Sequence, residues 1–508
     1  MLRRLLRTFQ RRRKARPARL ARAVALIQEG AAGPAESELR LALTEDPDNL
    51  DALHLLGTVL SARGEHVEAA ALLARCVEAA PDASEAHLHL AAALVKMGRD
   101  PDAEQALRAA VACAEYAVPA RNALGNFLVR QHRFEDALAE YGTLIAEAPE
   151  SIEGWINHGN VLRYMGSTVD ACRSYERALQ LAPTSADARY HYALALLANR
   201  EWQAGWNHYE ARFTYSGNTA EWRTLPFQAW EGQPVAGRKI LLWREQGLGD
   251  EIMFGSCIAD LLNAGAKVAI ECSAKLESIF RMSFPGALVY ARSPNRSLPS
   301  AVQDCDFHAP LGVLPRYVRR SDAEFPERGA YLVPDPARLA YWRERLATLG
   351  RGLKVGVSWR GGTPKTHRSI RSVPLERGRE ILNTPGAVFV NLQYADKPDD
   401  HVARAAITAG IVDFPETRED YAETAALVGA LDLVISVCTA VIHLGGALGR
   451  PVWVLTPSIP EWRYGIAGDT MPWYSSVRIF RQPADGDWDA VISRIAAELA
   501  AYPATAAP

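Results

Sequence analysis

The chain has 508 residues, of which 48% are hydrophobic and 23% are charged, and its formal net charge is −2. This length is too great for a single core, so we expect two or more domains, and the charge excludes bulk attraction to nucleic acid or anionic membrane. No uninterrupted apolar run reaches the roughly 18 residues that a transmembrane segment needs.

The first 23 residues carry ten Lys or Arg and no acidic residue. We interpret residues 1–15 as a basic N-terminal segment, a solvated helix that leads into the first domain. An amphipathic anchor on anionic lipid, or a patch for an acidic partner, is the alternative.

Residues 16–214 repeat with a period of 34. A small residue recurs where two helices of a unit would meet, a glycine recurs at the turn between them, and a proline recurs at the end of the unit. These positions are Ala35, Ala69, Ala103, Ala137 and Ala171; Gly30, Gly64, Gly98 and Gly166; and Pro47, Pro81, Pro149 and Pro183. His132 and Glu115 interrupt the glycine and proline series. Because the three registers agree, we expect stacked helical hairpins that bury their apolar faces against one another.

The spacing resembles the tetratricopeptide repeat (TPR), most fully in the fifth unit. That unit has Trp155, Gly159, Ala171, Tyr175, Ala178 and Pro183 in place. The resemblance implies an α-solenoid of five units, with a sixth, incomplete unit over 186–213. Such an array offers a concave groove to a segment of another protein; alternatively, it dimerises the chain or supports the second domain. The candidate groove residues are Asn157, Asn160, Arg163 and Tyr190.

From about Thr214 the period is lost, and Trp and Pro become frequent over residues 215–237, which we interpret as a linker. Short apolar runs then alternate with amphipathic stretches. We predict strands over 239–243 and 267–271 and helices over 251–264 and 274–282. This alternation is typical of parallel sheets built from βαβ units, and it defines a first α/β domain over 238–340.

A second alternating series defines another α/β domain over 341–508. We predict strands over 353–359, 387–393, 432–436 and 451–455, and helices over 375–382, 420–431, 440–448 and 488–499. The connection between the two sheets falls near 334–352. Two doubly wound sheets joined in this way place a cleft between the carboxyl ends of their strands, where ligands bind in such folds.

The first loop that could carry chemistry is "REQGLGDEI" (244–252). A dinucleotide fingerprint needs a third glycine where Ile252 stands, although Glu271 mimics the acid that binds the ribose, so an NAD-linked enzyme remains a rival interpretation. The glycines Gly247 and Gly249 form a tight turn that leaves Asp250 at the start of a helix. Asp250 is either an N-cap or a base at the mouth of the cleft.

Two loops of the second sheet favour phosphate binding. The loop 358–375 gathers Arg360, Lys365, His367, Arg368 and Arg371 beside two glycines, which suits a pyrophosphate unless it is merely a solvated basic loop. The loop 436–452 leads into a helix whose N-cap would be Thr439, so free amides and the positive end of the helix dipole would face a ligand. His443 lies one turn into that helix, where a packing role is the plainer interpretation.

The seven cysteines (76, 113, 172, 257, 272, 305 and 438) are odd in number and scattered, without a C-x-x-C pair. This spacing argues against a disulfide framework and against a zinc site. We therefore expect no metal and a reducing, cytoplasmic location.

These loops, in this order after a TPR array, resemble bacterial TPR-containing glycosyltransferases related to the heptosyltransferase-like family 9 group. The most specific elements are GLGDEI (247–252), RSVPL (371–375), VNLQ (390–393), LDLVISVCTAVIHLGGALGRPVWVL (431–455), and EWRYG followed by PWYSSVRIFRQ (461–482). The resemblance implies an α + α/β chain, in which the TPR α-solenoid precedes a GT-B module of two Rossmann-like domains. Such a module clasps a nucleotide-activated sugar and needs no cofactor or metal.

Carried over residue by residue, the resemblance makes Asp250 the general base. The donor-binding set that it implies is Gly247, Gly249, Trp359, Arg360, Lys365, Arg368, Gln393, Cys438, Thr439, Ala440, His443, Trp462 and Arg463. Related enzymes often have Asp where this chain has Cys438, and a thiol does not accept a hydrogen bond from a sugar hydroxyl as a carboxylate does.

The expected reaction is inverting transfer of a sugar to a hydroxyl of a protein that the TPR array recruits. Relatives with both modules modify Ser or Thr of flagellin with nonulosonic acids of the pseudaminic type, so flagellin is the leading acceptor. The alternatives are a TPR scaffold with a relic GT-B domain and, less favoured, the NAD-linked enzyme. The nucleotide, the sugar and the oligomeric state do not follow from the sequence.

Overall fold

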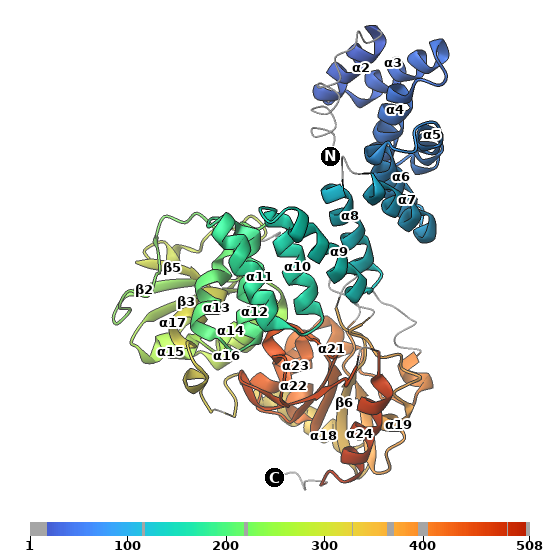
Figure 1. Ribbon diagram of the computed structural model, residues 1–508. Coiled ribbons are helices and arrows are strands. Elements are labelled where there is room, and N and C mark those ends of the chain that lie inside the picture. The colour runs from blue at the N-terminus through green and yellow to red at the C-terminus, as the bar shows by residue number, and fades with distance from the viewer. Residues whose placement is uncertain are drawn as a thin grey trace. The chain divides into compact units, whose positions relative to one another are not determined.

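The structure of the chain is a computed structural model that describes residues 18–113, 117–217, 222–327, 329–362, 370–394, 405–484 and 486–503, apart from the side chain of Glu419. The chain divides into two compact units. The first comprises Met1–Met165 and Arg173–Pro183, and the second comprises Gly166–Cys172 and Thr184–Pro508. Helices alone build the described part of the first unit, whereas the second combines helices with two sheets (Figure 1).

The first unit is a series of helical hairpins. Its helices are α2 (Ala18–Gln28), α3 (Ala32–Glu45), α4 (Leu50–Arg63), α5 (His66–Ala79), α6 (Ser84–Lys96), α7 (Asp100–Ala112), α8 (Ala117–Arg130), α9 (Phe134–Glu147) and α10 (Ile152–Tyr164), and α11 (Thr168–Leu181) spans the boundary between the units. Each helix from α2 to α9 packs against the next one along the chain. Contacts between neighbours are the ones that stabilise a repeat array.

The residues that recur every 34 positions have the environments that the repeat predicts. The alanines at 35, 69, 103, 137 and 171 are all 0% exposed, and at the first four of them the paired helices of the first unit approach closely. The turn glycines at 30, 64, 98 and 166 adopt positive φ angles of 78°, 90°, 71° and 81°. His132, which interrupts the glycine series, adopts the same conformation with φ 57°, and Arg200 continues the register with φ 62°. The backbone therefore keeps the left-handed turn even where a side chain makes it costly.

The long segment of the second unit, Thr184–Pro508, starts with the sixth repeat, which comprises α12 (Ala186–Ala198), α13 (Trp202–Tyr209) and the 3₁₀ turn η2 (Glu210–Phe213). Leu197, Trp202 and Trp206 from these helices belong to the same buried core as residues of both sheets. The sixth repeat is thus packed as an integral part of the α/β unit.

The first sheet has five strands in the order β1-β5-β2-β3-β4, and all of its pairings are parallel. The strands are β1 (Gln228–Ala229), β2 (Lys239–Trp243), β3 (Lys267–Cys272), β4 (Leu288–Ala291) and β5 (Phe307–Pro310). The helices of this part are α14 (Leu248–Gly255), α15 (Ile258–Asn263), α16 (Glu277–Ser283) and α17 (Pro315–Val318). The near-continuous apolar character of β2 and β3 agrees with a parallel sheet that is covered on both faces.

The second sheet has six strands in the order β10-β11-β9-β8-β6-β7, parallel except for the β10–β11 pair. The strands are β6 (Leu353–Ser358), β7 (Ala387–Asn391), β8 (Leu433–Val437), β9 (Val452–Thr456), β10 (Thr470–Met471) and β11 (Tyr474–Arg481). The helices are α18 (Pro336–Ala347), α19 (Arg379–Leu382), α21 (Glu416–Glu419), α22 (Tyr421–Ala430), α23 (Ala440–Ala447) and α24 (Trp488–Ala500).

The structure corrects several predicted elements. The helix predicted over 251–264 is two helices, α14 and α15, and only the last four residues of the helix predicted over 375–382 are helical, because Gly378 lies at its N-cap. The connection near 334–352 contains α18, which begins with an Asp335 cap and Pro336. The strands β1, β4, β5 and β10, of two to four residues, were not predicted, since short strands carry little periodic signal. The eight-residue strand β11 was not predicted either.

Candidate functional site

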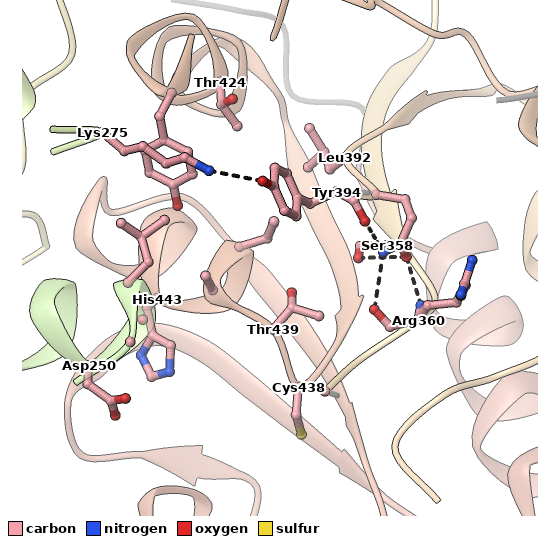
Figure 2. A pocket seen from close by; sticks show the side chains of 18 of the residues that line it. Asp250, Lys275, Ser358, Arg360, Leu392, Tyr394, Thr424, Cys438, Thr439 and His443 are labelled. Atoms are coloured by element: carbon pink, nitrogen blue, oxygen red, sulfur yellow. Dashed lines mark hydrogen bonds between the residues drawn. The ribbon is translucent and has the colours of Figure 1, made fainter. Parts of the chain in front are cut away.

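A cavity of about 1140 Å³ lies where the strands of both sheets end. From the first sheet it is lined by the loops after β2 and β3, and from the second by the segments that follow β6, β7, β8 and β9. Figure 2 shows Asp250 and His443 beside each other, Arg360 at a distance from them, and Thr439 in between. This position at the carboxyl ends of parallel strands is where α/β folds bind ligands.

Asp250 is the third residue of α14 and faces the cavity. Gly247 is the N-cap residue of this helix, so the N-cap interpretation of Asp250 is wrong. Its Oδ1 lies 2.7 Å from Nη2 of Arg463, and its side chain is 18% exposed. Burial raises the pKa of Asp250, and the neighbouring guanidinium of Arg463 only partly opposes this effect. The carboxylate is therefore a stronger base than an ordinary aspartate.

A row of alternating charges leads away from Asp250. Arg463 also lies 3.3 Å from Oε2 of Glu461, whose Oε1 lies 2.5 Å from Nη1 of Arg371. Nη2 of Arg371 donates to the carbonyl oxygen of Cys438 at 2.8 Å. The row fixes the turn after β9 against the loop that precedes α23. Arg371 was predicted as part of a basic loop and of the RSVPL motif, and Glu461 as part of the EWRYG motif, but neither had a predicted role of its own.

The N-termini of α14 and α23 meet at this site. A Cβ at Gly249 would lie 2.9 Å from Cδ2 of His443 and 3.5 Å from the Cα of Ala440. Thr439 is the N-cap residue of α23, as predicted, and its Oγ1 lies 3.1 Å from Oγ of Ser436. Gly249 thus allows the two helix starts to approach, and both positive dipole ends face the same cavity.

His443 is buried at 3% exposure, and its Nδ1 lies 3.2 Å from the Tyr474 hydroxyl. Burial lowers the pKa of this imidazole well below its usual value, and Arg463 adds to the effect. The ring is therefore neutral and contributes packing and a hydrogen bond, not a charge.

Gln393 is a buried residue that organises the loop after β6. Its Oε1 accepts from the backbone amides of Trp359 and Arg360 at 3.1 and 2.8 Å, and from the Ser358 hydroxyl at 3.2 Å. Its Nε2 donates to the carbonyl oxygens of Arg360 and Tyr394. These bonds use the whole amide, so its geometry suits positioning the loop better than contacting a ligand.

Cys438 lines the cavity but is only 2% exposed. Its Sγ lies 3.7 Å from the carbonyl oxygen of Leu455, and burial raises the pKa of the thiol to about 12. The side chain is thus a neutral thiol that cannot replace a carboxylate.

Only some of the remaining predicted donor-binding residues line the cavity. Gly247, Gly249, Arg360, Ala440 and Arg463 line the cavity. Trp359 lines a separate hollow of about 610 Å³, and Trp462 packs in an aromatic cluster with ring centroids 5.5 Å from Trp206 and 5.9 Å from Tyr209. Lys365 and Arg368 lie outside the described residues.

The four predicted groove residues are divided between the two units. Asn157, Asn160 and Arg163 lie on α10 in the first unit. Tyr190 lies on α12 in the second, where its ring stacks on Tyr215 at 4.1 Å.

Two cavity residues that the sequence analysis did not single out, Lys275 and Tyr394, face each other from different sheets. Nζ of Lys275 donates to the Tyr394 hydroxyl, a hydrogen bond drawn in Figure 2. Its length is 3.1 Å, and Nζ lies 4.5 Å from the centre of the Tyr394 ring. The only feature of the sequence that pointed to these two residues was their position after β3 and β7. This signal is weak, because polar residues follow many strands.

Glu271 does not have the environment of a ribose-binding acid. It is 0% exposed, and its Oε1 lies 2.6 Å from guanidinium nitrogens of both Arg223 and Arg292. Such a carboxylate has no access to a bound ribose, which disfavours the NAD interpretation. No group of three or more His, Cys, Asp or Glu within the described residues could hold a metal ion.

Comparison with known proteins identifies a repeat family for part of the chain and a relative that matches most of it. Residues 60–115 and 156–205 match the tetratricopeptide repeat family, which confirms the TPR prediction. The chain is 30% identical over 446 residues to Protein FlbA of Caulobacter vibrioides (strain ATCC 19089 / CIP 103742 / CB 15), covering 84% of this chain and 74% of that protein. The chain belongs to the FlbA family.

The other matches cover a smaller share of this FlbA-family chain. Protein O-mannosyl-transferase TMTC1 of Mus musculus is 30% identical over 156 residues, which are 30% of this chain and 15% of that protein. The solved structure of MamA covers 32% of this chain and 94% of its own at 22% identity and a TM-score of 0.30. A thermophilic TPR protein of Thermus thermophilus covers 35% of this chain and 97% of its own at 23% identity and a TM-score of 0.30.

No helix among the described residues of the FlbA-family chain has both the length and the apolar character to cross a bilayer.

Proposed function

We propose that this FlbA-family chain is a glycosyltransferase of the GT-B type, which moves a sugar from a nucleotide-sugar donor to a hydroxyl of a protein held by the TPR array. The observation that carries the proposal is the placement of Asp250 in a single cavity with the N-termini of α14 and α23. The cavity of about 1140 Å³ is large enough for a nucleotide sugar, since drug-sized ligands occupy roughly 300–1,000 Å³.

In the proposed reaction the acceptor hydroxyl oxygen attacks the anomeric carbon of the donor. The new C–O bond forms as the bond from that carbon to the phosphate oxygen breaks, and the electron pair leaves with the nucleotide. Asp250 takes the hydroxyl proton, a role that its raised pKa supports. The attack from the face opposite the leaving group inverts the anomeric centre.

The leaving phosphate gains negative charge during this step. The N-terminus of α23 at Thr439 and Ala440 offers backbone amides and the positive end of the helix dipole to that charge. Arg360 and, in the loop outside the described residues, Lys365 and Arg368 add cations. Arg463 holds the Asp250 carboxylate in place and adds its positive charge to the site.

The acceptor that we propose is a Ser or Thr hydroxyl of flagellin, and the donor is a nucleotide-linked nonulosonic acid of the pseudaminic type, with transfer in the cytoplasm. The resemblance to TPR-containing flagellin glycosyltransferases motivates both choices. The TPR match at residues 60–115 and 156–205 supports recruitment of a protein acceptor.

A donor panel tests the proposal. The thermal midpoint of the full chain is measured with CMP-, UDP-, GDP- and ADP-linked sugars and with reduced nicotinamide cofactor. A bound donor at 100 times its Kd stabilises the chain by about 2.7 kcal/mol, so one sugar nucleotide should raise the midpoint clearly. No shift with any sugar nucleotide would favour the scaffold alternative, and a shift with the nicotinamide cofactor alone would favour the NAD-linked enzyme.

A further inference from the structure

Lys275 contributes a positive charge to the cavity, and no acidic side chain in the described part of the chain pairs with it. Its Nζ contacts the hydroxyl of Tyr394 at 3.1 Å and lies 4.5 Å from the centre of that ring. Four arginines of the same cavity do form ion pairs with carboxylates: Arg244 with Glu251, Arg371 with Glu461, Arg418 with Asp413, and Arg463 with Asp250. A cavity ammonium group without a counter-charge favours an anionic ligand.

Two buried hydroxyl groups of this cavity have no hydrogen-bond partner among the residues that the structure describes. They are Oγ of Ser273, a residue that is 9% exposed, and the hydroxyl of Tyr421. Burial raises the pKa of Tyr421, so its hydroxyl keeps its proton and can donate. Because buried polar groups in proteins are nearly always paired, two unpaired hydroxyls at a cavity wall indicate hydrogen bonds that form with a ligand.

Ser273, Lys275 and Tyr421, which we call the Lys275 subsite, reach the cavity from both sheets. Ser273 directly follows β3 and Lys275 lies two residues further on, whereas Tyr421 is the first residue of α22. Figure 2 shows Lys275 on one side of the cavity and Asp250 on another. The Lys275 subsite is therefore separate from the proposed base.

The donor proposed above carries two anionic groups, the phosphate and the carboxylate of the sugar. In the proposed reaction the phosphate faces the N-terminus of α23 at Thr439, which belongs to the second sheet. In a nonulosonic acid the carboxyl group is bonded to the anomeric carbon, the same carbon that bears the phosphate oxygen. The bonds of that carbon point in different directions, so the carboxylate needs a second cationic site, and Lys275 supplies one from the first sheet.

We infer that Lys275, together with the hydroxyls of Ser273 and Tyr421, binds the carboxylate of an acidic donor sugar. This inference rests on the proposed function and names the group by which the donor is recognised. A carboxylate accepts up to about four hydrogen bonds, so one ammonium group and two hydroxyls suit it. A neutral sugar brings no charge to Lys275, and the Lys275 subsite therefore selects acidic sugars over neutral ones.

The test is the Kd of the full chain for three ligands, measured by calorimetry. They are the nucleotide-linked nonulosonic acid, the methyl ester of its carboxyl group, and the free nucleotide, with the nucleotide that the donor panel selects. Lys275→Met removes the charge and keeps a long side chain. We expect its affinity for the acid to fall about ten- to hundredfold, and its affinity for the ester and for the free nucleotide to change by less than about twofold.

Ser273→Ala and Tyr421→Phe test the two hydroxyls separately. Each variant should lose about two- to tenfold in affinity for the acid. The thermal midpoint of the free chain should not fall in either variant, because neither hydroxyl has a hydrogen bond to lose within the described part of the chain. A lower midpoint without a loss of affinity would show that the hydroxyls are structural and would remove them from the Lys275 subsite.

The matched control is Lys267→Met, which removes an exposed lysine at the other end of β3, outside the cavity, and should bind all three ligands as the wild-type chain does. An unchanged affinity of Lys275→Met for the acid, or equal losses for the acid and the ester, would overturn the inference.

Two further outcomes separate this inference from the proposed function. Transfer from a neutral sugar nucleotide in preference to the acid would overturn the inference and leave the glycosyltransferase standing. So would a Lys275→Met chain that binds the acid normally but binds flagellin weakly, since Lys275 would then contact an acidic side chain of the acceptor. A wild-type chain that binds no sugar nucleotide would overturn the proposed function together with this inference.

Discussion

The environment of Asp250 differs from that of an ordinary surface aspartate. Burial raises the pKa of its carboxyl group, and Arg463 at 2.7 Å pulls the pKa back toward the usual range. The balance between these two effects sets the pH at which the proposed base becomes ionised. A substitution of Arg463 should therefore change the pH at which Asp250 becomes ionised.

The pH profile of transfer should report this balance. The base acts when it is ionised, so kcat/KM should rise with pH through a pKa above the usual range of an aspartate. Arg463→Gln removes the charge that lowers the Asp250 pKa, and it should therefore move this acidic limb to higher pH. Arg244→Gln, which removes a cavity arginine paired with Glu251, is the control that should leave the limb in place. An acidic limb that stays fixed in Arg463→Gln would show that Asp250 is not the group observed.

At the scale of elements, the contact between α14 and α23 brings the base close to the proposed phosphate site. Gly249→Ala places a Cβ 2.9 Å from His443 in this contact. Overpacking of this kind costs about 1–3 kcal/mol, so we expect a lower free energy of unfolding and weaker donor binding.

Gly247→Ala provides the matched control, because its Cβ would meet nothing closer than Oδ2 of Asp250 at 3.6 Å. Urea unfolding of both variants measures the difference. Equal stability of the two variants would mean that the helix contact is looser than described.

The loop that precedes α14, the helix of Asp250, is also fixed by the sixth repeat. Arg212 of η2 and Glu245 form a bidentate ion pair at 2.8 and 2.7 Å, with side chains 3% and 2% exposed. Glu245→Gln leaves a buried guanidinium without its counter-charge, which should lower the free energy of unfolding by about 3–5 kcal/mol.

Glu210→Gln removes a comparable pair with Arg316, but there both side chains are more than a third exposed. Solvent screening reduces the value of such a pair to about 0–1 kcal/mol. The difference between the two variants in chemical denaturation is the measurement. Similar losses in both would contradict a special role for the buried pair.

At the scale of the whole molecule, the array and the α/β unit should be separable in function. A chain that begins at Ser151, the N-cap of α10, keeps the fifth and sixth repeats with both sheets. We expect it to retain stabilisation by the donor within about twofold in Kd, because repeats depend mainly on their neighbours, and to lose most affinity for flagellin. Loss of donor binding in this chain would show that the α/β unit depends on the first four repeats.

The repeat array was predictable because each 34-residue register carries a direct steric signal, such as an alanine that must be fully buried. The main parallel strands were equally predictable, because they are runs of apolar residues. The edge strands and α18 were not, since a short strand or a charged helix lacks a strong period.

For the site, the sequence allowed us to predict which loops contribute to it but not the contacts between them. Placing Asp250, Thr439 and His443 at strand ends follows from topology. The pairing of Asp250 with Arg463, the use of Gln393 to hold a loop, and the burial of Glu271 depend on contacts between segments far apart in the sequence, which a single sequence does not reveal.

The most direct test of the central claim is the intact mass of unglycosylated flagellin after incubation with the full chain and the donor found in the panel. We expect that the wild-type chain adds the mass of one or more sugars, and that Asp250→Asn lowers the transfer rate by about 10²–10⁴-fold while the donor still stabilises the variant. Asp304→Asn, which breaks an exposed aspartate–lysine pair with Lys239 outside the cavity, should keep the transfer activity. Equal transfer by wild type and Asp250→Asn would contradict the account.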